Sequence, residues 1–113
     1  MSLAWESIPQ ILFDILEIMV AKSEPLFPLG KVVATPAALA ALEEAGQSPA
    51  EFLDRHVRGC WGDLDPEDWK ANEDALRNGE RLLSAYVLKT GERLWIITEH
   101  DRSVTTCLLP SCY

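Results

Sequence analysis

The amino-acid sequence predicts an α+β fold, with N-terminal helices followed by a three- to four-stranded antiparallel β-meander. Two observations lead to this prediction. Up to residue 79, apolar residues recur at helical spacing, and three of these runs begin with Thr, Ser or Asp followed by Pro. From Leu82 onward the spacing changes to two, which is typical of strands with one buried face. We expect one domain over residues 1–113, because a chain of 113 residues has the size of one ordinary domain.

Residues 8–22 predict an additional N-terminal helix with a very wide apolar face. The polar residues fall on one narrow stripe, and most other positions are Ile, Leu or Met. Asp14 and Glu17 interrupt the apolar run, so we do not expect a membrane span. A face this wide is either enclosed by the fold or packed against another copy. A homodimer through residues 8–22 is therefore one hypothesis.

The next part of the chain predicts a connector, a short strand and a helix. Residues 23–30 contain two prolines and a glycine, which is typical of a connector. Residues 31–35 form a short β-branched run that predicts a strand. Thr35 precedes Pro36 as an N-cap precedes the first helical residue, and this helix is expected to end at Gly46.

Two further helices are expected on either side of the stretch HVRGCWGDLD, residues 56–65. Ser48 and Glu51 have the spacing of a capping box, and the helix they begin is expected to end near Gly59. Asp65 begins the next helix, which ends at Asn78-Gly79. The inner faces of these helices are predicted to carry Phe52, Leu53, His56 and Val57 in the first and Trp69, Asn72 and Leu76 in the second.

The stretch itself is interpreted as a packed corner, with Trp61 as the hydrophobic contact between the two helices. Because buried polar groups need partners, His56 and Asn72 are expected to form hydrogen bonds across the junction or to the sheet. Trp61, Trp69, Trp95 and Tyr86 are expected to join the helices to the sheet.

Three strands are expected within residues 82–89, 92–99 and 103–110. A two-residue loop at Thr90-Gly91 predicts a register in which Val87 faces Leu94 and Tyr86 pairs with Trp95. The second hairpin, around the corner at residues 100–102, has two possible registers, and the sequence does not choose between them.

Composition and charge favour a cytoplasmic protein with a basic partner. The chain has 18 acidic and 10 basic residues, a formal charge of −8, and a mean hydropathy of −0.01. This balance disfavours nucleic acid as a partner, because phosphates are repelled. No signal peptide is recognisable, and an odd number of cysteines without paired spacing, Cys60, Cys107 and Cys112, indicates a reducing compartment.

The segments LGKVVATPAALAALEEAGQSPAEFLDRHVRG, WGDLD, RLLSAY and RLWIITE resemble a family of small uncharacterised proteins of bacterial plasmids and integrative conjugative elements. The resemblance covers residues 29–113, so residues 8–22 are an addition to the family core. The family pattern has an acid at the position of Cys60 and two acids before the final tyrosine, where this chain has Ser111 and Cys112. Any role of acids at these positions therefore does not carry over. The resemblance implies a mobile genetic element as the habitat, and no activity.

Metal and covalent chemistry are not expected. His56, Cys60 and Asp63 have a spacing at which they can meet, but a structural zinc needs four ligands and usually paired cysteines. No third group is evident that would orient His56 toward Cys60, so a cysteine nucleophile is not expected either. We predict no metal and no cofactor, and we interpret the cysteines as buried and weakly polar.

The alternative function is a metal-independent ribonuclease of the bacterial toxin type, because helices followed by an antiparallel meander resemble that architecture. Such an enzyme needs a proton shuttle, a cation on the phosphate and hydroxyl donors. The candidates are His56, Arg102, Tyr86 and either Thr105 or Thr106. Against this hypothesis, His56 shares a helix face with apolar residues, Arg102 lies beside Asp101, and the net charge is acidic.

We therefore expect a non-catalytic protein-interaction module that binds a protein of the host or of a mobile element. Two groups of acids, within residues 43–54 and 63–74, are expected to give adjacent helices a negative face. Capping and solvation account for many of these acids. The residues predicted to form the binding site are Trp61, Asp63, Asp65, Glu67, Asp68 and Asn72.

Overall fold

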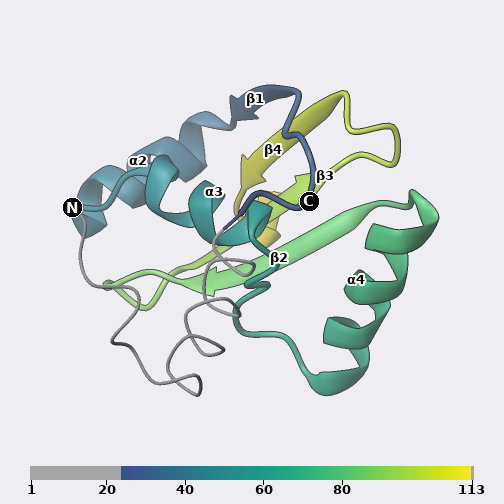
Figure 1. Cartoon of the computed structure of the whole chain (residues 1–113). Coiled ribbons are helices and arrows are strands. Elements are labelled where there is room, and N and C mark those ends of the chain that lie inside the picture. Colours follow the sequence, from purple (N-terminus) through teal and green to yellow (C-terminus); the bar gives the residue numbers. More distant parts are fainter. Residues whose placement is uncertain (1–23, 113) are drawn as a thin grey trace, which may run out of the picture.

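The computed structural model describes residues 24–112 and shows an α+β fold (Figure 1). Its elements, in chain order, are β1 (Lys31–Ala34), α2 (Pro36–Ala45), α3 (Pro49–Val57), α4 (Pro66–Asn78), β2 (Leu82–Val87), β3 (Arg93–Thr98), β4 (Val104–Leu108) and the 3-10 helix η2 (Pro110–Cys112). The positions and types of the helices and strands predicted for this part of the chain are confirmed. The predicted helix at residues 8–22, and with it the homodimer hypothesis, lies outside the described residues.

The sheet is mixed, which corrects the prediction of a purely antiparallel meander. Its strand order is β1-β4-β3-β2, and β2, β3 and β4 form the predicted antiparallel meander. β1 joins the sheet in parallel to β4, with Lys31 opposite Val104. Gly30 explains the contact, because its φ of 65° and lack of a side chain let it pack against the carbonyls of Arg102 and Ser103. Sequence patterning predicts a strand, but it does not say which neighbour the strand pairs with.

The register of the first hairpin differs by one residue from the predicted register. Val87 lies opposite Arg93, where Leu94 was expected. The loop is the reason: the Leu88 amide donates to the Glu92 carbonyl at 2.8 Å, and Gly91 has a φ of 92°. The loop therefore has three residues, Lys89 to Gly91, and a glycine in the left-handed region closes it.

This shift changes which aromatic residues share a face of the sheet. Tyr86 pairs with Leu94 on the side of the main core, and Trp95 pairs with Ala85 on the other side. The predicted pair of Tyr86 and Trp95 is therefore wrong. A shift by one residue moves every side chain of a strand to the opposite face. The second hairpin, left open by the sequence, places Thr98 opposite Thr105.

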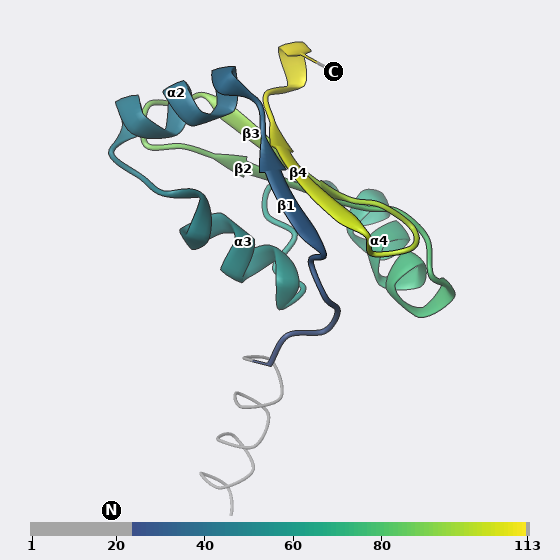
Figure 2. The same ribbon diagram turned by 90° about the horizontal axis from the view of Figure 1, so that it is seen from above.

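Helices α2 and α3 lie on one side of the sheet, as Figure 2 shows. The Thr35 hydroxyl accepts from the Ala38 amide at 3.1 Å, and Gly46 ends α2 in the left-handed conformation, both as predicted. The capping box of α3 does not form: the Ser48 side chain makes no cap bond. The main core under these helices consists of Ala38, Ala41, Leu42, Phe52, Tyr86, Leu88, Leu94, Ile96, Cys107 and Leu109.

Helix α4 lies apart from α2 and α3, beside β2 (Figures 1 and 2). Asp65 begins it by accepting the Asp68 amide at 3.1 Å, and Gly79 ends it. Under α4 lies a second core cluster, which consists of Phe27, Trp61, Ala75 and Leu82.

Candidate functional site

The corner between α3 and α4 is packed and structural, as the sequence predicts. Gly59 and Gly62 have φ angles of 82° and 85°, and they turn the chain so that Trp61 is fully buried. The Trp61 indole donates to a Glu73 carboxylate oxygen at 2.8 Å. A side chain at Gly62 would collide with the Ala85 carbonyl and the Tyr86 ring. The stretch therefore fixes α3 and α4 against the edge of the sheet.

His56 lies at the centre of a buried hydrogen-bond network. Its Nδ1 lies 2.5 Å from the Ser84 hydroxyl and its Nε2 lies 2.8 Å from the Thr98 hydroxyl. Thr98 contacts the Thr105 hydroxyl at 2.7 Å, and Thr105 donates to the Leu29 carbonyl at 2.7 Å. His56, Ser84, Thr98 and Thr105 have no exposed surface.

The direction of these bonds shows which nitrogen of His56 carries a proton. A carbonyl only accepts, so Thr105 gives its one proton to Leu29 and must accept from Thr98. Thr98 then accepts from His56, so Nε2 is protonated. Burial, followed by the positive charge of Arg102, lowers the pKa of the imidazole from 6.5 to about 3. The imidazole is therefore neutral at pH 7, and Nδ1 accepts from the Ser84 hydroxyl.

Asn72 bonds to the outer edge of β2. Its side-chain amide donates to the Leu83 carbonyl at 2.5 Å, and its oxygen accepts from the Leu83 amide at 3.1 Å. Nearby, the Ala85 amide donates to the Trp61 carbonyl at 3.0 Å, and the Asp63 amide donates to the Ala85 carbonyl at 2.6 Å. The expected inward bonds of His56 and Asn72 are thus confirmed. Asn72 and Trp61, both predicted as binding residues, hold the fold together from buried positions.

The four residues of the ribonuclease hypothesis do not converge in an open cleft. His56 and Thr105 are enclosed in the network, and the Tyr86 hydroxyl donates to the Cys60 carbonyl at 2.6 Å. Arg102 donates to the carbonyls of Glu80, Glu99 and Ala75 at 2.5, 3.1 and 3.3 Å.

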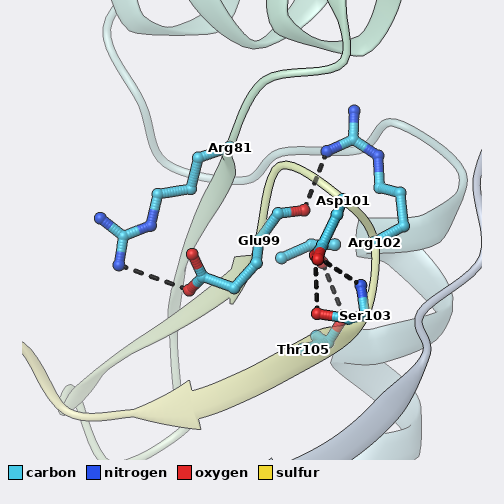
Figure 3. Close-up of polar contacts among 7 residues, drawn as sticks. Arg81, Glu99, Asp101, Arg102, Ser103 and Thr105 are labelled. Atoms are coloured by element: carbon cyan, nitrogen blue, oxygen red, sulfur yellow. Dashed lines mark hydrogen bonds and ion pairs between the residues drawn. The ribbon is translucent and has the colours of Figure 1, made fainter.

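Figure 3 shows the hairpin corner around Arg102. The Arg102 side chain turns to the Glu99 carbonyl, and the Asp101 carboxylate accepts from the Ser103 amide and hydroxyl at 3.0 and 2.6 Å. The proximity of Arg102 and Asp101 in the sequence suggests a local ion pair, but among residues 24–112 Arg102 bonds to backbone carbonyls and forms no ion pair with Asp101. The guanidinium also lies over the Phe27 ring, 5.7 Å from its centre. These contacts give Arg102 a structural role between the hairpin, Phe27 and the end of α4.

The cysteines differ in their surroundings. Cys107 is buried as expected, and burial raises the pKa of its thiol to about 11, so the thiolate is scarce at neutral pH. Cys60 is exposed, which corrects the prediction of a buried thiol. Within residues 24–112, no group of three or more His, Cys, Asp or Glu side chains is placed to hold a metal ion.

A largely apolar groove lies at the start of α4, beside a smaller hollow that is lined in part by acids. Leu64, Pro66 and Trp69, together with the side chains of Lys70 and Glu73, line an open groove of about 460 Å³. A second hollow of about 310 Å³ shares Leu64 and is bordered by Asp63, Asp65, Asp68 and Arg93, among others. Of the predicted binding residues, the structure brings these together on the surface: Asp63, Asp65, Glu67 and Asp68 are all exposed.

Trp69 is the surface residue that the sequence prediction placed inside. Its side chain is 37% exposed, whereas Asn72 and Ala75 fill the inner face of α4. Helical spacing gives no signal for this position, because Trp69 lies on the same predicted stripe as Asn72 and Leu76. Among residues 24–112, Asp63 forms an ion pair with Arg93 at 3.1 Å, but Glu67 and Asp68 form none.

Searches of protein families, curated proteins and solved structures find no match to this chain. Within residues 24–112, no helix has the length and apolar character needed to cross a membrane.

Proposed function

We propose that this protein is a non-catalytic interaction module that binds a basic segment of another protein at the groove of α4. The observation that carries the proposal is the position of Trp69. A large, partly exposed aromatic ring lines the groove together with apolar Leu64 and Pro66, and Asp65 and Asp68 line the adjoining hollow. Tryptophan is strongly enriched among the residues that dominate binding at protein interfaces.

At the start of α4, exposed carboxylates outnumber Lys70, the cation that lines the groove, and this excess favours a cationic ligand. Asp65, Glu67 and Asp68 lie within the first turn of α4 or directly before it, and all three are exposed. Complementary charge increases the rate of association and excludes like-charged partners, while an apolar contact supplies affinity. The expected ligand therefore combines lysine or arginine with one large apolar side chain. If the resemblance to mobile-element proteins holds, this partner is a cytoplasmic protein of the host or of such an element.

A titration with defined peptides tests the proposal. The probe is a lysine-rich peptide with one central leucine, compared with a matched peptide in which glutamate replaces each lysine. Isothermal titration calorimetry is expected to show binding of the lysine peptide only. Trp69→Ala is expected to weaken this binding at least about tenfold, because it removes the apolar contact. Affinity unchanged by Trp69→Ala would contradict the proposal.

A matched pair of charge variants separates a local site from the effect of net charge. Asp68→Lys changes an exposed carboxylate that lines the hollow beside the groove, and Glu44→Lys changes an exposed carboxylate on α2 by the same amount of charge. Only Asp68→Lys is expected to weaken binding of the lysine peptide, by about threefold to tenfold at low salt. Equal weakening by both variants would show that overall charge, and not the groove, attracts the peptide.

A further inference from the structure

The two edges of the sheet are treated differently. At the outer edge of β2, the side chain of Asn72 bonds to both backbone groups of Leu83. The Trp61 carbonyl and the Asp63 amide then bond to both backbone groups of Ala85. These contacts cover the edge, which is how many proteins prevent a foreign strand from pairing.

Strand β1, at the opposite edge, has no such cover within residues 24–112. The amides of Lys31 and Thr35 donate toward β4, to the carbonyls of Ser103 and Cys107 at 2.9 and 3.0 Å. Because alternate residues of a parallel strand bond to the same neighbouring strand, the backbone groups of Val33 also point toward β4. The backbone groups of Val32 and Ala34 therefore point outward, and no bond to the described residues occupies their amides.

The side chains of this edge are also open. Val32 is 44% exposed and Val33 is 36% exposed. Val33 pairs with Thr106, and thereby lies on the face of the sheet turned away from α2 and α3. Two adjacent β-branched residues on an uncovered edge are the feature that most favours addition of another strand.

We propose that β1 pairs in antiparallel fashion with β1 of a second copy, so that two sheets join into one. Outward-pointing groups pair with each other, so Val32 of one copy exchanges hydrogen bonds with Ala34 of the other. This register places Val33 directly opposite Val33 of the second copy, on the twofold axis. The edge is its own complement, as a symmetric dimer requires.

Charge placement is compatible with a second copy as the occupant. In this register Lys31 lies opposite Thr35 of the second copy, so no two lysines face each other across the strands. Each copy carries a formal charge of −8, so two copies repel at long range. Association between copies is therefore expected to strengthen as salt rises, because salt screens this repulsion. Binding of a lysine peptide at the α4 groove has the opposite salt dependence.

A charge-swap experiment tests both the interface and its register. Light scattering coupled to gel filtration is run from about 5 μM to about 500 μM protein, the range in which a small interface is expected to dissociate. Wild type is expected to change from 12.6 kDa toward twice this mass. Val33→Lys and Val33→Glu each place like charges on the axis, so each is expected to weaken association at least about tenfold. An equal mixture of the two variants is expected to restore it, because lysine then faces glutamate.

Val87→Lys is the matched control. Val87 is an exposed valine on the same face of the sheet, on β2, so this variant changes the charge equally and is expected to associate like wild type. Circular dichroism checks that each variant is folded. A wild type that stays monomeric at all concentrations and salts would overturn the proposal. Persistent association of the single variants, or a mixture that stays monomeric, would overturn the interface or its register.

Discussion

His56 explains why polar residues occupy the middle of this sheet. Ser84, Thr98 and Thr105 lie on the inner face of three neighbouring strands, where each hydroxyl needs a partner. One imidazole from α3 contacts two of these hydroxyls and, through them, the third. The network thereby connects α3 to β2, β3 and β4, and burial keeps its imidazole neutral at pH 7 by lowering the pKa to about 3.

Acid is predicted to destabilise the fold through His56. Its folded pKa, lowered to about 3, lies below the unfolded value of 6.5. Above pH 6.5 both states are neutral, and the full stabilisation is present. As the pH falls below 6.5, only the unfolded chain takes up the proton, and the free energy of unfolding falls by up to about 1.4 kcal/mol per pH unit. Urea denaturation between pH 7 and pH 5 measures this slope.

Two variants test whether His56 causes this pH dependence of the free energy of unfolding. His56→Gln is expected to lower stability at pH 7 and to remove most of the slope, because glutamine does not titrate. His100→Gln changes the exposed histidine, and it is expected to leave the pH dependence of the free energy of unfolding unchanged. A wild type with equal stability at pH 7 and pH 5 would contradict the proposed neutral network.

A methyl group at Gly62 is predicted to be costly. It would collide with the Ala85 carbonyl and the Tyr86 ring, and the φ of 85° is unfavourable for any other residue. Gly62→Ala is expected to lower the free energy of unfolding by about 2–4 kcal/mol. Gly91→Ala is the control, since it has a similar φ of 92° but no atom near its added carbon. Equal losses in the two variants would show that backbone strain alone is responsible.

Among the elements, α4 is predicted to depend on Asn72 for its attachment to β2. Asn72→Ala removes both hydrogen bonds to Leu83 and exposes the edge of β2. We expect a loss of about 2 kcal/mol in the free energy of unfolding and new aggregation during heating. Asn78→Ala, at an exposed position of the same helix, is the control. Thermal unfolding with light scattering measures both effects, and a soluble, equally stable Asn72→Ala variant would contradict this role.

Element boundaries are predictable here because their signals are local. Thr35-Pro36, Asp65-Pro66 and Asn78-Gly79 act on their own turns of helix, and they begin or end helices as expected. The capping box predicted at Ser48 is an exception, because it does not form. The Ser48 side chain makes no cap bond, and the Glu51 carboxylate instead accepts from Gln47 at 3.1 Å and lies 3.9 Å from Arg55.

At the scale of the whole molecule, the candidate site could be predicted only in part. The sequence singles out Asp63, Asp65, Glu67 and Asp68 because acids at the start of a helix are recognisable from their order. It places Trp69 inside, because helical spacing alone does not distinguish the buried side of α4 from its edge. Only the packing of Asn72 and Ala75 against β2 turns Trp69 outward and creates the groove.

The sequence by itself determined the order and type of the elements from residue 24 onward, the packed corner at Trp61 and the inward position of His56. These features depend on hydrophobic spacing and on caps within a few residues of each other. Tertiary structure alone decided the pairing of β1 with β4, the register of the first hairpin and the exposure of Trp69. Each of these depends on contacts between segments distant in the chain or on the conformation of a single loop glycine, and neither is encoded in local periodicity.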